Sequence, residues 1–303
     1  IFFWKERYPI TTYLVSLAIY PYTIWSEQYI SPISNDTMAI EHYVFPDRYE
    51  SSYPNYSLTG EMLSFFSNLF GEYPFISEKY GHADFKWGGG MEHQTLSSMG
   101  SFSQNLIVHE LGHSWWGNLI TCKTFNDIWL NEGFARYCQA LWLENIDGKQ
   151  AYFNFMNDHA YYGGGTIYVE NPSSNSQIFN SSLSYNKASW VLHMLRHKVG
   201  DEMFFEILKE YASNDSLAYN AASTADFQKV CEDISGMDFE QFFQQWIYGD
   251  RYPKYELSWW SEENDIYKVE IDQIQSYGIF SMPIDLNFSG SVGPLSVDTT
   301  IVV

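Results

Sequence analysis

The chain contains 303 residues, 45% of them hydrophobic and 19% aromatic, which is enough for two or three domains with a sizeable core. Its 37 acidic and 16 basic residues leave a net charge of −21, which argues against nucleic acid, a partner that needs a basic surface. The same charge is compatible with a positively charged substrate, such as a free amine. No stretch approaches the roughly 18–20 apolar residues of a membrane span.

The three cysteines are too few and too scattered for a disulfide framework. The acidic composition and the sparse cysteines would fit an exported bacterial enzyme, although the sequence leaves both the compartment and the oligomeric state open. The chain opens abruptly on I-F-F-W, and we expect it to be a fragment of a longer protein.

The first part of the chain predicts β structure. Residues 12–20 and 38–44 are rich in β-branched and aromatic side chains, and the first of these stretches reads as a buried strand. A turn-rich stretch, F-P-D-R-Y-E-S-S-Y-P-N, follows the second. We therefore place a domain boundary near residue 52.

Helical periodicity begins after residue 57, where apolar side chains recur every three or four residues until Gly71. A capping box at residues 101–104 predicts the start of the next helix, and Gly117 its end. Further helices are expected over residues 127–145, 187–199, 201–212, 224–235 and 238–248.

Beyond residue 253 the pattern changes to period two, which is typical of half-buried antiparallel strands. The chain ends on T-T-I-V-V, which predicts a final strand. The alternating apolar positions are Tyr267, Val269 and Ile271 in one strand, and Met282, Ile284, Leu286 and Phe288 in another.

Residues 107–118 read I-V-H-E-L-G-H-S-W-W-G-N and contain a metal-site pattern. His109 and His113 are four residues apart, so on a helix both imidazoles point towards the same place. Zinc prefers imidazole nitrogen, and a catalytic zinc site keeps an open position for water. Glu110 lies slightly off that axis and suits a general base that takes the proton of this water. The alternative is two histidines that simply find hydrogen bonds on an apolar helix.

Glu132 favours the metal site over the hydrogen-bonded histidines. It lies in W-L-N-E-G-F-A, an otherwise apolar helix, where a carboxylate is costly unless it is paired or binds a metal. A third metal ligand on a neighbouring helix explains this glutamate better than burial alone.

H-E-L-G-H, eighteen further residues and then Glu132 together resemble the M1 family of zinc aminopeptidases, which includes aminopeptidase N and leukotriene A4 hydrolase. The W-W-G-N after His113 is similar to the same pattern. The resemblance implies one zinc ion held by His109, His113 and Glu132, as in other gluzincins.

W-G-G-G-M-E-H at residues 87–93 is by itself a glycine run that lets backbone approach a ligand. In this context it resembles the family's G-x-M-E-N exopeptidase motif, on Gly89, Gly90, Met91 and Glu92. The resemblance implies that the backbone pairs with the peptide and that Glu92 binds the free α-amine. The sequence departs from the motif at His93, where the family usually has asparagine.

Tyr185, in S-Y-N-K-A at the start of a helix, would by itself be read as packing. It resembles a family tyrosine that stabilises the tetrahedral oxyanion opposite the zinc. A phenol aimed at developing negative charge contributes strongly in a dry site.

The resemblance implies an α+β multidomain protein. Residues 1–51 would be the end of an N-terminal β domain, residues 52–250 a thermolysin-like, mostly helical zinc catalytic domain, and residues 251–303 a β-sandwich-like segment. The implied function is a metallo-aminopeptidase that acts on peptides with a free N-terminus, with Glu110 and Tyr185 as catalytic residues. A gluzincin endopeptidase, an epoxide-hydrolysing relative and a catalytically decayed peptide-binding relative stay open as alternatives.

Overall fold

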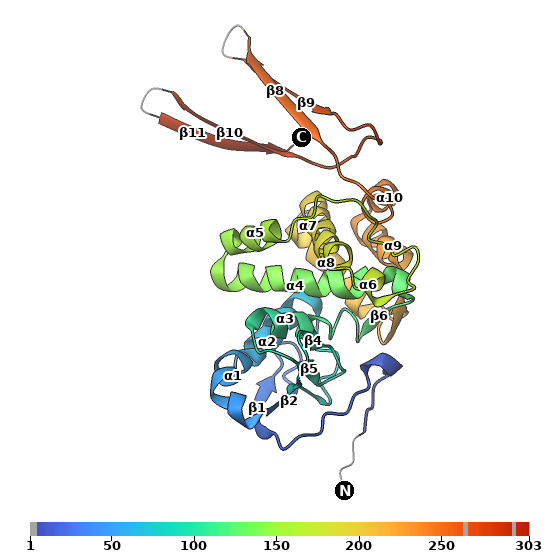
Figure 1. The fold of residues 1–303 in the computed structure, drawn as a ribbon. Helices are drawn as coiled ribbons and strands as arrows, with labels where there is room; N and C mark the ends of the chain where they lie inside the picture. The colour runs from blue at the N-terminus through green and yellow to red at the C-terminus, as the bar shows by residue number, and fades with distance from the viewer. Residues whose placement is uncertain (1–4, 263–265, 293–294, 303) are drawn as a thin grey trace.

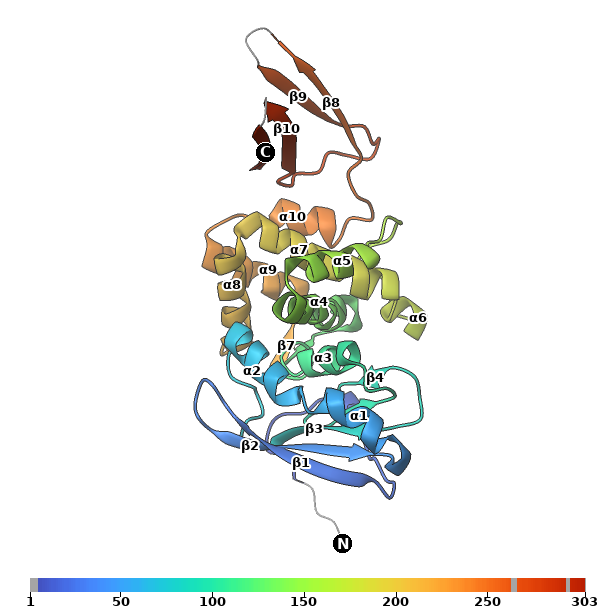
Figure 2. The same cartoon turned by 90° about the vertical axis from the view of Figure 1, so that its left-hand side faces the viewer.

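The computed structural model describes residues 5–262, 266–292 and 295–302. A mixed sheet forms one end of the molecule, a layer of helices lies across it, and two β-hairpins follow at the other end (Figure 1). Figure 2 shows that α3 lies between the sheet and the long helix α4. Among the described residues, no helix is both long and apolar enough to span a bilayer.

The sheet contains five strands in the order β1-β2-β3-β5-β4. β1 and β2 are antiparallel, β2, β3 and β5 are parallel, and β4 runs antiparallel to β5 at the edge of the sheet. The strands are β1 (Thr23–Ile30), β2 (Thr37–Val44), β3 (Lys79–Asp84), β4 (Gly90–Met91) and β5 (Ser97–Met99).

The strand expected at residues 38–44 is confirmed as β2, whose alternate side chains are buried. The buried strand expected at residues 12–20 is wrong. This stretch contains a 3₁₀ turn, η1 (Thr12–Leu14), followed by extended chain in which Leu17 is 81% and Ile19 86% exposed. Its β-branched residues lack a partner strand, and β propensity reports side-chain packing rather than a backbone preference. Because β1 pairs with β2 and β2 pairs with β3, the sheet extends across the boundary expected near residue 52.

Two helices cover this sheet (Figure 2). α1 (Tyr49–Tyr56), preceded by the 3₁₀ turn η2 (Pro46–Arg48), occupies the stretch that the sequence predicted as turns. α2 (Thr59–Phe70) is confirmed and ends at Gly71, whose φ of 102° favours glycine.

The two helices of the expected metal site are present, with corrected ends. α3 (Gln104–Gly112) begins after Ser103, whose Oγ accepts from the backbone N–H of Leu106, so the capping residue is not Ser101. It ends at Gly112 rather than near Gly117. α4 (Trp129–Asp147) matches its prediction within two residues and is mostly buried.

The helices around α4 complete the core. Those predicted near residues 187–199, 201–212, 224–235 and 238–248 are confirmed, whereas α5, α6 and the π-helical turn η4 were not predicted. A short parallel pair, β6 and β7, joins the loop after α3 to the segment before α9. The elements are β6 (Ile120–Cys122), η3 (Phe125–Asp127), α5 (Lys149–Asp158), α6 (Asn175–Ile178), η4 (Ser181–Lys187), α7 (Ala188–Val199), α8 (Asp201–Ser213), β7 (Asn220–Ala222), α9 (Thr224–Ser235) and α10 (Glu240–Trp246).

The last segment forms two antiparallel hairpins, as the period-two pattern predicts. The strand expected from Met282 starts three residues later, and the expected final strand is confirmed up to Val302, beyond which Val303 lies outside the described residues. The hairpins are β8 (Tyr255–Ser261) with β9 (Tyr267–Gln273) and β10 (Asp285–Val292) with β11 (Leu295–Val302).

Candidate metal centre and substrate pocket

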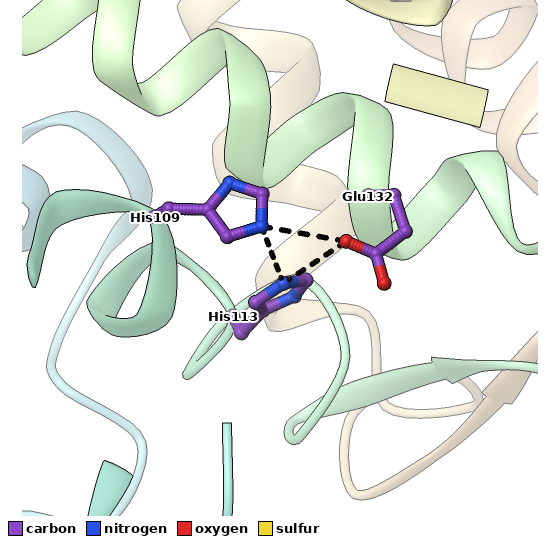
Figure 3. A group of neighbouring side chains, drawn as sticks. All are labelled: His109, His113 and Glu132. Atoms are coloured by element: carbon purple, nitrogen blue, oxygen red, sulfur yellow. Dashed lines mark hydrogen bonds and ion pairs between the residues drawn. The ribbon is translucent and has the colours of Figure 1, made fainter. Parts of the chain in front are cut away.

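Three side chains from α3 and α4 converge on one point (Figure 3). The Nε2 atoms of His109 and His113 are 3.3 Å apart, and Glu132 Oε2 lies 3.4 Å from the first and 3.3 Å from the second. In a tetrahedral site with bonds of about 2.0–2.1 Å, neighbouring ligand atoms lie roughly 3.3–3.4 Å apart. The three predicted ligands therefore fit one face of a zinc coordination tetrahedron, and the fourth corner is left for water or substrate.

Hydrogen bonding prepares His113 for this role. Its Nδ1–H donates to the carbonyl oxygen of Trp116 at 2.9 Å, so the other ring nitrogen can present a lone pair to a metal. His109 Nδ1 is buried without a hydrogen-bond partner among the described residues.

Close helix packing brings the ligands together. α3 ends at Gly112, where an added Cβ would lie 3.0 Å from the sulfur of Cys138 on α4. Because the last turn of α3 therefore lies directly against α4, both imidazoles reach the first turn of that helix. Glu132 occupies this first turn, where the partial positive charge of a helix N-terminus favours a carboxylate.

The pocket concentrates buried negative charge. Burial raises the pKa of Glu110 and of Glu92, while the pKa of Glu132 stays below its usual value because interactions with His113 and His109 outweigh burial. Three carboxyl groups so close together repel one another unless protons or a cation neutralise them. A divalent cation at the triad would meet this demand.

Glu110 points into the same pocket and is only 3% exposed. Its carboxylate lies directly against Gly90 of the edge strand, where any Cβ would collide with it. A side chain at position 90 would therefore displace Glu110, which explains the glycine at this position.

Only part of the glycine-rich stretch lines the pocket. Gly90, Met91 and Glu92 line the pocket of the triad, which has a volume of about 410 Å³. Gly89 is outside this lining and instead accepts a hydrogen bond from the N–H of Gly100 at 2.8 Å. Its φ of 81° favours glycine.

His93, the departure from the family motif, turns away from the triad. Its Nδ1 lies 2.8 Å from Ser98 Oγ, and the side chain lines a second cavity of about 570 Å³ beneath the N-terminal segment. Glu92 keeps its position through its backbone, whose carbonyl accepts from Asn118 Nδ2 at 2.9 Å. The histidine therefore adds no charge to the pocket of the triad.

Tyr185 reaches the triad from the π-helical turn η4. Its ring stacks on His109 at 6.0 Å between centroids and lies 5.8 Å from the guanidinium carbon of Arg136. Burial raises its pKa above the usual value, so the side chain remains a phenol that can donate a hydrogen bond. π-helical turns are rare and occur mostly at functional sites.

Tyr13, which no sequence pattern indicated, reaches this pocket from the N-terminal segment. Its hydroxyl lies 3.2 Å from Thr121 Oγ1 and accepts from Asn131 Nδ2 at 3.3 Å. Asn131 Oδ1 in turn accepts from the N–H of Cys122 at 3.0 Å. No local signal marks Tyr13, because its partners lie more than one hundred residues away.

Two further missed residues stand at the rim of the pocket. Phe125 and Phe179 are 46% and 42% exposed and meet edge to face, with ring centroids 6.4 Å apart. The pocket therefore combines a carboxylate-rich floor with an aromatic rim, which suits a ligand that has a charged amine and apolar parts.

Known proteins share this sequence pattern and fold. The family model described as the peptidase family M1 domain matches residues 57–246. Aminopeptidase N of Lactococcus lactis subsp. lactis is 32% identical over 160 residues, which are 49% of this chain and 19% of that protein. Glutamyl aminopeptidase of Rattus norvegicus is 26% identical over 277 residues, which are 81% of this chain and 28% of that protein. The chain thus spans less than a third of these relatives.

Solved structures share the fold. An M1 zinc metallopeptidase from Deinococcus radiodurans superimposes with a TM-score of 0.68 at 24% identity, over 82% of this chain and 57% of that chain. Aminopeptidase A of Legionella pneumophila, in complex with aspartic acid, gives a TM-score of 0.77 at 16% identity, over 93% of this chain and 35% of that chain. Because the family model covers more than half of the residues, this chain belongs to peptidase family M1.

Proposed function

We propose that this chain carries the active site of a zinc-dependent aminopeptidase, which removes the first residue from peptides with a free N-terminus. The observation that carries the proposal is the triangle of His109, His113 and Glu132, with Glu110 and Glu92 in the same pocket. The relatives that are named aminopeptidases support it.

Zinc held by the triad would lower the pKa of a bound water and polarise the first peptide carbonyl. Glu110 takes one proton from the attacking water as its oxygen bonds to the carbonyl carbon. The same carboxyl group returns this proton to the nitrogen when the C–N bond breaks, so the released amine leaves neutral. Burial of Glu110, which raises its pKa, favours this exchange.

Two side chains orient the substrate. Glu92 binds the α-ammonium group of the peptide, so only one residue fits between this carboxylate and the triad. Tyr185 donates a hydrogen bond to the oxyanion that forms at the carbonyl. Its stacking on His109 keeps the phenol beside the metal ligands.

We also propose domain boundaries that differ from those expected from the sequence. The catalytic domain would begin with β1 and extend to residue 250, because β1 and β2 belong to the sheet that carries the substrate strand β4. Residues 251–303 would form a separate β-sandwich-like segment, since the two hairpins pair only within themselves among the described residues.

Hydrolysis of alanyl p-nitroanilide tests the function, with acetyl-alanyl p-nitroanilide as the blocked control. We expect cleavage of the free substrate alone, because the blocked one lacks the charge that Glu92 binds. Glu110→Gln should lose at least about 100-fold in kcat and keep its zinc, which can be measured by atomic absorption. Equal cleavage of both substrates would indicate an endopeptidase, and wild-type activity of Glu110→Gln would refute the base assignment.

A further inference from the structure

Trp87 is an exposed aromatic side chain at the start of the glycine run, outside the lining of the triad pocket. It is 79% exposed, although large aromatic side chains usually bury most of their surface. It stands five residues before Glu92, on the chain that leads into the edge strand β4. A peptide that pairs with this strand could also contact the ring.

The structure holds Trp87 firmly despite this exposure. An added Cβ at Gly100 would collide with the carbonyl oxygens of both Trp87 and Gly89, so the two chain segments lie in close contact. The ring of Phe85 packs against that of Trp87 edge to face, with centroids 5.5 Å apart. The backbone of Trp87 is therefore held in place, and Phe85 packs against one part of its exposed ring.

β4 presents a free edge beside this ring. Gly90 stands opposite Met99 in the antiparallel register, and the N–H of Gly100 donates to the carbonyl of Gly89. Hydrogen-bonded and non-hydrogen-bonded pairs alternate in such a ladder, so the N–H and C=O of Gly90 point away from β5. Because β4 is the last of the described strands in this sheet, these groups are available to an added peptide strand.

The position of Glu92 determines the direction of that peptide. If its amine lies at Glu92, at the end of β4, an antiparallel peptide runs back past Gly90 towards Trp87. An extended strand advances about 3.4 Å per residue, so the five positions from Glu92 to Trp87 correspond to no more than roughly 17 Å. This limit would place the sixth residue at the ring. Residues 86–89 are bent, so the true separation is shorter than the limit, and the ring is within reach of the third to fifth peptide residues.

We propose that Trp87 forms a downstream binding subsite, which holds an apolar or aromatic side chain at the third to fifth residue of the peptide. This inference depends on the proposed aminopeptidase function for its direction. It identifies the substrate class as extended oligopeptides rather than dipeptides. Contact with the ring would bury apolar surface on both partners and add to the main-chain pairing along β4.

A peptide series tests the subsite. Phenylalanine is moved through positions three, four and five of an alanine pentapeptide, and kcat/KM is measured for each peptide and for alanyl p-nitroanilide. Trp87→Ala should lose about 5- to 10-fold on the best phenylalanine peptide, as is typical when a well-packed aromatic contact is truncated. It should keep the wild-type value on the anilide. Trp259→Ala is the matched control, because Trp259 is 65% exposed but lies on β8.

Calorimetric binding of the same peptides to Glu110→Gln, with and without Trp87→Ala, separates the subsite from the chemistry. A Trp87-dependent affinity for the phenylalanine peptides supports the subsite even if the wild-type protein cleaves no anilide, in which case only the proposed function fails. If the anilide is cleaved but Trp87→Ala changes no peptide, the subsite is refuted alone. An equal loss of kcat/KM on the anilide and on every peptide would also refute the subsite, because Trp87→Ala would then disturb the structure of the active site in general.

Discussion

Tyr185 shows how a single side chain is placed by two neighbouring side chains. His109 stacks on the ring, and Arg136 supplies a positive charge beside it. The hydroxyl is thereby left as the group that can face a substrate carbonyl. The role proposed for it depends on this hydroxyl rather than on the ring.

Tyr185→Phe tests that role at the scale of one atom. We expect kcat to fall by about 100- to 1000-fold with little change in KM, because the lost hydrogen bond forms mainly in the transition state. Zinc content should equal that of the wild type. Tyr162→Phe is the control, since Tyr162 is 71% exposed. Wild-type kcat, or a parallel loss of zinc, would contradict the oxyanion assignment.

Tyr13 and His93 mark the limit of residue-level prediction. The convergence of the three proposed metal ligands could be predicted because two of them share a helix and the third is a carboxylate in an apolar stretch. Tyr13 enters the pocket through a contact with Asn131 that spans 118 residues of chain. The orientation of His93 away from the triad depends on Ser98 of the neighbouring strand. Neither tertiary contact leaves a local pattern.

At the scale of elements, a buried histidine pair joins two parallel strands. His42 of β2 and His82 of β3 have their Nδ1 atoms 3.1 Å apart, and neither Nε2 has a hydrogen-bond partner among the described residues. The ring of Tyr56 stacks on both imidazoles. Two protonated imidazoles would repel each other at this distance, so at least one of the two rings must be neutral.

This pair predicts acid sensitivity of the fold. Burial lowers the pKa of His42 to about 3 and that of His82 well below 6.5. Because the folded values lie below the unfolded ones, the stabilisation is complete above about pH 6.5 and is lost as the pH falls towards 3. For each histidine, the free energy of unfolding falls by up to about 1.4 kcal/mol per pH unit as the pH decreases.

Urea denaturation at pH 7.5, 6.5 and 5.5 measures this effect. Between pH 6.5 and 5.5 the free energy of unfolding of the wild type should fall by about 2 kcal/mol more than that of the variant that combines His42→Gln and His82→Gln. Gln150→Ala, an exposed position on α5 without a titratable group, should keep the wild-type pH dependence. Identical slopes in all three proteins would show that the pair does not titrate on unfolding.

Elements with a strong local signal were predicted, and those that depend on distant partners were not. α2 and α4 carry regular apolar spacing and end at Gly71 and Gly148. The stretch at residues 12–20 has the composition of a strand but lacks a partner, so it stays extended at the surface. The π-helical turn η4 has no recognised sequence signal, although it carries Tyr185.

At the scale of the whole molecule, the proposed metal would join two layers. α3 lies against the sheet and α4 belongs to the helical layer (Figure 2), and the ligands come from both. A bound ion would thus stabilise the contact between the layers as well as supply chemistry.

Removal of the metal should therefore destabilise the fold and not only stop catalysis. We expect chelation to lower the free energy of unfolding by about 4 kcal/mol when free zinc had been roughly 1000-fold above its Kd. Calorimetric thermal melts with and without chelator measure the difference. His113→Ala should melt at the same temperature in both conditions. A wild-type melting temperature that chelator leaves unchanged would argue against a shared ion between α3 and α4.

The segment between α3 and α4, which includes β6, bears on specificity. Its backbone and side chains hold His113 through Trp116, Glu92 through Asn118, and the start of α4 through Cys122. One short segment therefore holds both Glu92, the proposed amine-binding residue, and His113 of the proposed metal triad. Under the proposed function, an insertion in this segment would shift Glu92 relative to the triad and so change how many residues leave in each cycle.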